Sequence, residues 1–158
     1  MSDCVRWSAQ REILAVAALR GSGQLRLKVS GESMLPTLWP GDVVEIDACQ
    51  AADVGRGEIV LAWRDGRFFL HRFLAERSSG FLTCGDSMPA ADPEFAPDAL
   101  LGKLRRVERT GRQVELRCRP WTRLLGILLC YSGTARRIAL RVHGSHTPGI
   151  AAVDWETA

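Results

Sequence analysis

The sequence predicts a mainly β protein, a barrel or sandwich of short strands with a short helix before this core and an amphipathic helix after it. Two hairpins support the β core, because Asp65-Gly66 and Thr110-Gly111 each separate two runs of strand-forming residues. Short runs of this kind, joined by turn residues, are typical of barrels and sandwiches. After Pro120 the character changes, and the apolar residues take up helical spacing.

The expected elements follow in a simple order. A helix over residues 8–19 begins at Ser8, a capping residue, and ends at the Gly21-Ser22-Gly23 stretch. Seven strand-like runs come next, at residues 25–30, 43–46, 58–64, 67–75, 80–84, 100–109 and 113–118.

The chain of 158 residues is long enough for one domain with a hydrophobic core that needs no metal or disulfide. We expect an N-terminal helical arm over residues 1–24, a core over residues 25–119, and a basic helical extension with a tail over residues 120–158.

The extension reads as a short basic amphipathic helix. Its apolar residues are Ala135, Ile138, Ala139 and Val142, and its basic residues on the opposite face are Arg136, Arg137 and Arg141. Two interpretations stay open: the helix lies on a membrane surface, or it packs on the β core. The tail from Gly144 to Ala158 is expected to be loose.

The composition by itself predicts no particular function. An apolar fraction of 46%, a charged fraction of 25% and a net charge of +3 are ordinary for a soluble protein and do not predict a nucleic-acid partner. No run of 18 apolar residues predicts a membrane span, and the N-terminus does not read as a secretory leader. We therefore expect a cytoplasmic protein, peripheral at a membrane if its C-terminal helix binds lipid.

The cysteines predict neither disulfides nor a metal. They are odd in number, scattered and without a C-x-x-C pair, which indicates a reducing compartment and no zinc site. No cofactor is expected. The five residues are Cys4, Cys49, Cys84, Cys118 and Cys130.

Ser33 is the candidate nucleophile. A serine hydroxyl attacks poorly unless a base takes its proton, so its surroundings matter more than its identity. Ser33 follows a predicted strand, lies near Gly31 and precedes Pro36, which places it at a rim close to backbone N–H groups. A loop serine alone is common and carries little weight.

The wider pattern carries more weight. The segment Ser33–Leu38 (SMLPTL), continued by Gly41–Val44 (GDVV), resembles the nucleophile box of the type I signal peptidase family. Gly57–Val60 (GEIV), His71–Phe73 (HRF) and Phe81–Ser87 (FLTCGDS) resemble the following boxes of that family, in the same order. The resemblance covers about residues 25–107, and the joint order of four boxes is more specific than any one of them.

Position 71 distinguishes branches of the family. Bacterial signal peptidases have Lys-Arg there, whereas the archaeal and endoplasmic-reticulum enzymes have His-Arg, as here. The related self-cleaving repressors share the serine box but use lysine and carry an N-terminal DNA-binding domain. The resemblance therefore implies a serine endopeptidase with a Ser33-His71 dyad that cleaves an extended, leader- or signal-like peptide.

An acidic residue would complete this dyad. Neutral imidazole can accept the serine proton near neutral pH, and a carboxylate fixes its tautomer and stabilises the imidazolium. Asp92 and Asp86 both match acidic positions of the His-type enzymes. We favour Asp92 as the residue that orients His71; Asp86 is the alternative, or it holds its loop together.

Three residues around the nucleophile are expected to contact substrate: Gly31, Met34 and Pro36. Family members often have a hydroxyl residue at position 31 that helps to bind the oxyanion, and the loss of one such donor costs about a hundredfold in rate. The chain has two lysines, of which Lys103 is expected to be structural and Lys28 is a remote alternative base.

Three functions stay open. The first is the serine endopeptidase. The second is a peptide-binding module that has lost catalysis, because Gly31, Cys84 and Ser87 depart from the family pattern. The third is a self-cleaving regulator with a scissile bond upstream of Ser33, for which Ala17-Ala18 is a candidate.

Overall fold

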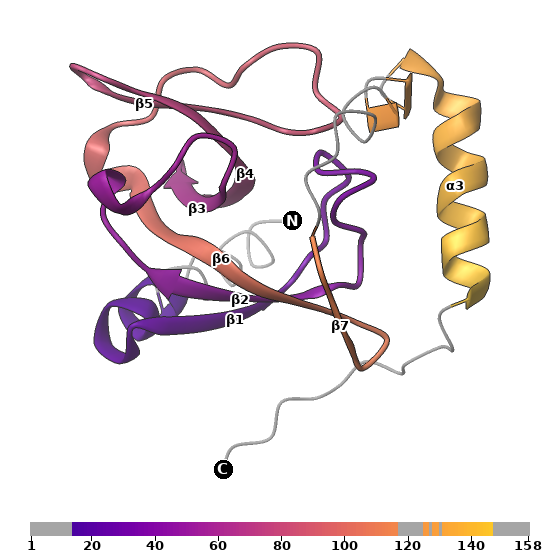
Figure 1. Ribbon diagram of the computed structural model, residues 1–158, viewed down its shortest axis with the longest axis horizontal. Helices are drawn as coiled ribbons and strands as arrows, with labels where there is room; N and C mark the ends of the chain where they lie inside the picture. Colours follow the sequence, from indigo (N-terminus) through magenta and orange to yellow (C-terminus); the bar gives the residue numbers. More distant parts are fainter. Residues whose placement is uncertain (1–13, 117–124, 127, 130, 147–158) are drawn as a thin grey trace, which may run out of the picture.

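A single curved antiparallel sheet organises the protein (Figure 1). The computed structural model describes residues 14–116, 125–126, 128–129 and 131–146. Neighbouring strands follow the order β1-β2-β6-β3-β4-β5, and β7 pairs with β6. The strands are β1 Gln24–Lys28, β2 Val43–Ala48, β3 Ile59–Arg64, β4 Arg67–Arg77, β5 Gly80–Cys84, β6 Leu100–Arg109 and β7 Arg112–Val114. The predicted mainly β fold is confirmed.

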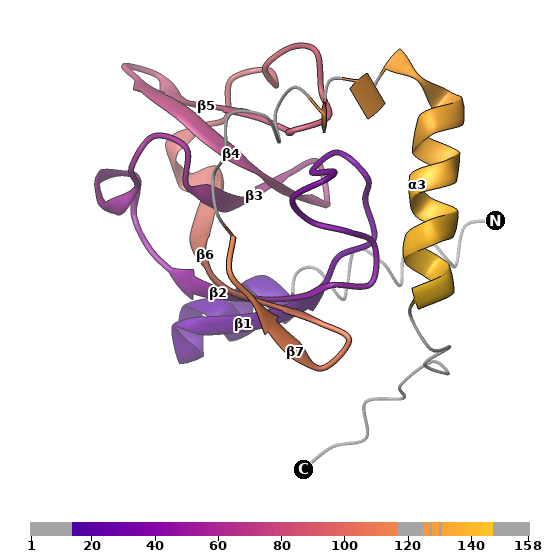
Figure 2. The ribbon, with the colours of Figure 1, turned by 45° about the vertical axis from the view of Figure 1, so that its right-hand side comes forward.

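Strand β6 belongs to both halves of the sheet. It pairs with β2 through residues 102–108 and with β3 through residues 100–103. Both ladders contain a register shift, and such bulges bend and twist a sheet. In Figures 1 and 2, β6 runs as a long bent strand between the β1-β2 layer and the β3-β4-β5 layer.

Both predicted hairpins are present. Asp65 and Gly66 have φ values of 52° and 72°, and Thr110 and Gly111 have values of 51° and 76°. Two successive left-handed residues match the right-handed twist of the flanking strands, which explains why these dipeptides predict hairpins. Strand β7 is shorter than predicted and ends at Val114.

The core divides into two clusters. One lies between the halves of the sheet and includes Met34, Leu38, Val44, Ile46, Leu61, Leu101 and Val107. The other contains Phe73, Phe81 and Phe95, whose rings stack in sequence. Two short 3-10 helices, Ala51–Asp53 and Pro97–Ala99, connect strands at its edge.

The first helix extends further than predicted. Residues 14–22 are helical, so the helix continues past Gly21 and ends at Gly23, where φ is +76° and the N–H bonds to the carbonyl of Leu19. Leu19 is 1% exposed and anchors this helix in the core. The expected start at Ser8 lies outside the described residues.

The C-terminal helix α3 spans Gly133–His146 and stands at one side of the sheet (Figure 2). Its end packs against the loop after β1, because the rings of His143 and Trp39 stack 4.3 Å apart. The predicted apolar face is divided, since the alanines are half-buried whereas Ile138 and Val142 are more than half exposed. The expected loose tail is corrected at its beginning, because residues 144–146 continue the helix.

Within the part of the chain that the structure describes, no helix has both the length and the apolar character needed to cross a membrane.

Candidate active site

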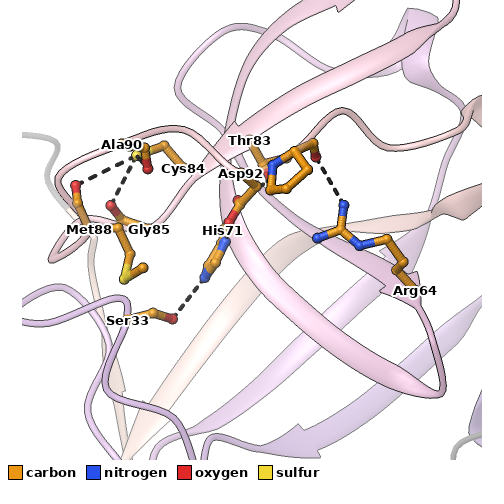
Figure 3. Close-up of polar contacts among 10 residues, drawn as sticks. Ser33, Arg64, His71, Thr83, Cys84, Gly85, Met88, Ala90 and Asp92 are labelled. Atoms are coloured by element: carbon orange, nitrogen blue, oxygen red, sulfur yellow. Dashed lines mark hydrogen bonds and ion pairs between the residues drawn. The ribbon is translucent and has the colours of Figure 1, made fainter.

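Ser33, His71 and Asp92 form a continuous hydrogen-bonded chain (Figure 3). Nε2 of His71 lies 2.8 Å from Oγ of Ser33, and Nδ1 of His71 lies 2.6 Å from Oδ2 of Asp92. The three residues come from the loop after β1, from β4, and from the segment after β5. The side chains of His71 and Asp92 are 7% and 11% exposed, so this part of the chain is shielded from bulk water.

Strand β4 separates two neighbouring side chains with different roles. Successive residues of a strand point to opposite faces, so His71 and Arg72 diverge. His71 faces Ser33, and its ring meets Phe69 edge-on at 6.0 Å. Arg72 instead donates to the carbonyl of Gly57 and to the carboxylate of Asp86.

The loop that carries Ser33 is closed at its base. The N–H of Val29 bonds to the carbonyl of Asp42, and the N–H of Gly41 bonds to the carbonyl of Val29, both at 2.8 Å. The carboxylate of Asp42, which is 1% exposed, accepts two hydrogen bonds from Arg109 and one from the N–H of Trp39. A buried carboxylate requires such partners, so the Gly-Asp pair of the sequence motif fixes the end of this loop.

Asp86 holds the other side of the same loop. Arg72 donates to its two carboxylate oxygens over 2.6 and 2.9 Å, and the hydroxyl of Thr37 bonds to Oδ2. This geometry corrects the alternative that Asp86 orients His71, because its carboxylate is engaged by Arg72 and Thr37 while Asp92 contacts the imidazole. Asp86 connects β4 to the nucleophile loop.

The segment after β5 holds the backbone on both sides of Ser33 by hydrogen bonds. Ser87 donates its N–H to the carbonyl of Ser33 at 2.9 Å and its hydroxyl to the carbonyl of Glu32 at 2.8 Å. Gly85 is required by this close approach, because a Cβ there would lie 2.6 Å from the carbonyl oxygen of Ser33. Ser87, which departs from the family pattern, therefore has a defined structural contact.

Asp92 is held in its charged form. Burial raises the pKa of its carboxyl group, but hydrogen bonds from His71 and Thr83, together with electrostatic interactions with His71 and Arg64, outweigh burial and leave the pKa below its ordinary value. Arg64 also donates to the carbonyl of Pro93 and stacks over the rings of Phe69 and Phe95. A carboxylate that stays ionised is suited to balance an imidazolium.

A cleft of about 550 Å³ opens beside this chain of residues. Ser33, His71 and Asp92 line it together with Gly31 and Met34. The rest of its wall is mostly apolar and includes Leu27, Val29, Val44, Leu61, Phe68, Phe69 and Leu70.

Pro36 is not among the residues that line this cleft. The chain turns into the core directly after Ser33, where Leu35 and Leu38 are fully buried, and Pro36 is carried away with them. Lys28 lines the cleft, but the partner of the Ser33 hydroxyl is His71. Lys103 is engaged elsewhere, because its ammonium donates to the carbonyl of Asp53.

Among the described residues, no three histidine, cysteine, aspartate or glutamate side chains are grouped so that they could hold a metal ion. Two cysteines lie in this part of the chain: Cys49 is half-buried and Cys84 is buried.

Sequence reasoning missed two contacts of this site. Thr83 and Arg64 both act on Asp92 or its neighbours, yet neither stands at a position to which the motif assigns a role. Thr83 lies within the box that contains Asp86, but its partner comes from a segment nine residues further on, which no local pattern indicates.

A mainly β fold with serine, imidazole and carboxylate in line beside an apolar cleft has the geometry of a serine-peptidase-type site. The Peptidase S24-like family model matches residues 9–101, which include all three residues and more than half of the chain. The chain therefore belongs to the Peptidase S24-like family, which includes serine peptidases and self-cleaving regulators. No curated protein shows a significant match to the chain.

Proposed function

We propose that this protein is a serine endopeptidase in which Ser33 attacks the peptide bond, His71 is the general base and Asp92 orients His71. The observation that carries the proposal is the 2.8 Å distance from Nε2 of His71 to Oγ of Ser33, with Nδ1 of the same ring held by Asp92. This distance is within the reach required for proton transfer. We also propose that the protein is of the Ser-His type found in the archaeal and endoplasmic-reticulum signal peptidases.

The reaction follows from these atoms. Nε2 of His71 takes the proton of Ser33 while Oγ attacks the substrate carbonyl carbon, and Asp92 balances the imidazolium. The imidazolium then gives its proton to the leaving nitrogen, so the C–N bond breaks and an ester remains on Ser33. Water, deprotonated by His71, hydrolyses this ester and restores the free serine.

Oxyanion stabilisation would come from the backbone. The N–H of Ser33 is the nearest candidate donor to the attacked carbonyl, and the clamp by Ser87 fixes the orientation of the adjoining peptide groups. Gly31 adds no side-chain donor, which predicts modest catalytic power.

The cleft suits an extended peptide. Residues 27–31 form one of its walls and residues 67–71 of β4 form another. Among the described strands, β1 pairs with β2 alone and β5 covers β4 from Arg72 onward, so both walls present strand edges that can accept a further strand. The apolar lining favours apolar substrate side chains near the cleaved bond.

An active-site probe tests the proposal. We expect a fluorophosphonate to label Ser33, and we expect the Ser33→Ala and His71→Ala variants to lose labelling while their circular dichroism spectra match that of the wild-type protein. Ser79→Ala, at an exposed turn, is the matched control. Absence of labelling in the wild-type protein would instead favour the peptide-binding module.

Self-cleavage at Ala17-Ala18 is not favoured by the described structure. Both residues lie in the helix over residues 14–22, and the carbonyl of Ala18 accepts a hydrogen bond from the Ser22 hydroxyl. A peptidase of this geometry needs an extended bond, so this helix would have to unfold first. The intact mass of the purified protein after long incubation tests this: a stable full-length chain excludes cleavage there.

We also propose peripheral membrane contact through α3 and the residues before it. Leu128, Tyr131, Ile138 and Val142 are between 56% and 76% exposed, and Arg137 and Arg141 are exposed beside them. Apolar side chains next to cationic ones match the interface of an anionic bilayer, where the first enter the acyl boundary and the second meet the headgroups.

A further inference from the structure

A buried hydroxyl shares the carboxylate oxygen that holds His71. Thr83, on β5, is 0% exposed, and its Oγ1 donates to Oδ2 of Asp92 over 2.6 Å. The same oxygen accepts the hydrogen bond from Nδ1 of His71 (Figure 3). One carboxylate oxygen therefore receives two donors, one from the ring that faces Ser33 and one from the sheet.

Thr83 holds Asp92 at a second point. The backbone N–H of Asp92 donates to the carbonyl of Thr83 over 2.9 Å, so the residue and its side chain are both tied to β5. Thr83 is in register with Phe73 of β4, two residues from His71. The strand pair thus places the donor to Asp92 and the histidine at a fixed separation.

The hydroxyl is difficult to explain as packing alone. At a fully buried strand position, valine has the same shape as threonine and strand preference of the same kind, without the cost of burying a hydroxyl. A buried hydroxyl is retained at no loss only where it has a partner, and here that partner is the carboxylate of Asp92.

We propose that Thr83 is a positioning residue of the Ser33-His71-Asp92 site. Its hydroxyl fixes Oδ2 of Asp92 where this oxygen accepts the Nδ1 proton of His71, and it thereby keeps the unprotonated Nε2 directed at Ser33. The inference rests on the proposed peptidase function for its catalytic consequence, but the tautomer of His71 can be measured without catalysis.

The other charged neighbour of Asp92 has a separate role. Arg64 donates to the carbonyl of Pro93 and lies over Phe95, so it stabilises the segment that carries Asp92 and adds a positive charge near it. Arg64 is thus a charged neighbour of Asp92, and Thr83 is a neutral donor to it. Of Arg64 and Thr83, Thr83 is the one whose hydrogen bond reaches the oxygen that His71 uses.

Replacement of the hydroxyl by a methyl group tests the proposal. We expect Thr83→Val to lower kcat for peptide cleavage, or the rate of probe labelling at Ser33, by about tenfold to a hundredfold, because it removes a hydrogen bond to a charged group. KM should change less than about twofold, because Thr83 is outside the cleft. Thr83→Ser, which restores the donor, should recover most of the rate.

A double-mutant cycle separates positioning from packing. If Thr83 acts through Asp92, then Thr83→Val should have little further effect in an Asp92→Asn background. If it lowers the rate there by the same factor as in the wild-type background, or if Thr83→Ser is as slow as Thr83→Val, the inference is wrong. The Tm of every variant shows whether a change in rate reflects loss of the fold.

Nitrogen-15 NMR of the His71 ring distinguishes this inference from the function on which it rests. We expect the wild-type ring to carry its proton on Nδ1 at neutral pH, and Thr83→Val to weaken this preference or accelerate exchange of that proton. An unchanged tautomer and exchange rate in Thr83→Val would overturn the inference even in an active enzyme. If Thr83→Val changes the tautomer of His71 but the probe never labels the wild-type protein, the inference is supported and peptidase function is rejected.

Discussion

Arg72, the residue after His71, binds both carboxylate oxygens of Asp86 over 2.6 and 2.9 Å. The two side chains are only 17% and 5% exposed, and Thr37 of the nucleophile loop joins them. Strand β4 and the loop of Ser33 are therefore connected twice, through the Ser33-His71 contact in the cleft and through this ion pair on the other face of β4.

The first prediction concerns this ion pair. Asp86→Asn leaves the Arg72 charge without its counterpart, and the loss of one partner of a buried pair destabilises a protein by about 3–5 kcal/mol. We expect a loss of this order in urea unfolding, and a fall in probe labelling at Ser33 because Thr37 is released. Glu108→Gln, which breaks an exposed pair with Arg26, is the control and should cost less than about 1 kcal/mol. Equal costs in the two variants would contradict this account.

The second prediction concerns acid. The pKa of Asp92 in the folded protein lies below its ordinary value of 3.8, so its carboxylate contributes stability above about pH 4, and that contribution is lost as pH falls through the folded pKa. We expect Asp92→Asn to reduce the free energy of unfolding more at pH 7 than at pH 3. The exposed Asp98→Asn serves as the control in the same urea titrations. If Asp92→Asn instead reduces the free energy of unfolding more at pH 3 than at pH 7, the direction assigned to the pKa of Asp92 is wrong.

The third prediction concerns the oxyanion. A Cβ at Gly31 would meet no atom within 4 Å, and Gly31 lines the cleft, so a side chain there has room. We expect Gly31→Ser to raise kcat/KM by about tenfold, because a hydroxyl at this position can donate to the developing oxyanion. Gly31→Ala, which adds the Cβ without the donor, should stay near the wild-type rate. A similar gain in both variants would point to backbone restriction instead.

The fourth prediction concerns the membrane. We expect the protein to sediment with phosphatidylserine-containing vesicles and much less with vesicles of phosphatidylcholine alone. The paired change Arg137→Glu and Arg141→Glu should abolish the preference for anionic lipid, and Ile138→Ser should weaken binding to it. Arg112→Glu, at the first residue of β7, is the control for a charge reversal away from this surface. If the variant with Arg137→Glu and Arg141→Glu binds anionic vesicles as well as the wild-type protein does, α3 is not the membrane-binding surface.

The parts of the fold that the sequence predicts well depend on neighbouring residues. The turns at Asp65-Gly66 and Thr110-Gly111 need only two left-handed residues, and the strand Gly80–Cys84 has the bounds that its residue pattern predicts. The ends of the first helix and of β7 were less well predicted, because packing of Leu19 and pairing with β6 decide them.

The site also has parts that the sequence predicts and parts that only contacts in the folded protein decide. The order of the motifs predicts Ser33, His71 and Asp92 as site residues. The sequence alone does not decide whether Asp86 or Asp92 orients His71. Arg72 decides between them, because its fork occupies Asp86 and leaves Asp92 to His71. The exposure of Ile138 cannot be predicted from the sequence either, because a helical pattern shows which side of the helix is apolar but not what covers that side.

The shared strand β6 has a consequence for how the protein is made. Ser33 follows β1 and His71 lies on β4, and among the described strands the β1-β2 ladder joins the β3-β4-β5 ladder only through residues 100–108 of β6. During synthesis the two ladders can form early, but they cannot be aligned until β6 has left the ribosome. The nascent chain therefore emerges with Ser33 and His71 apart, and the proposed dyad cannot assemble until most of the protein has been translated.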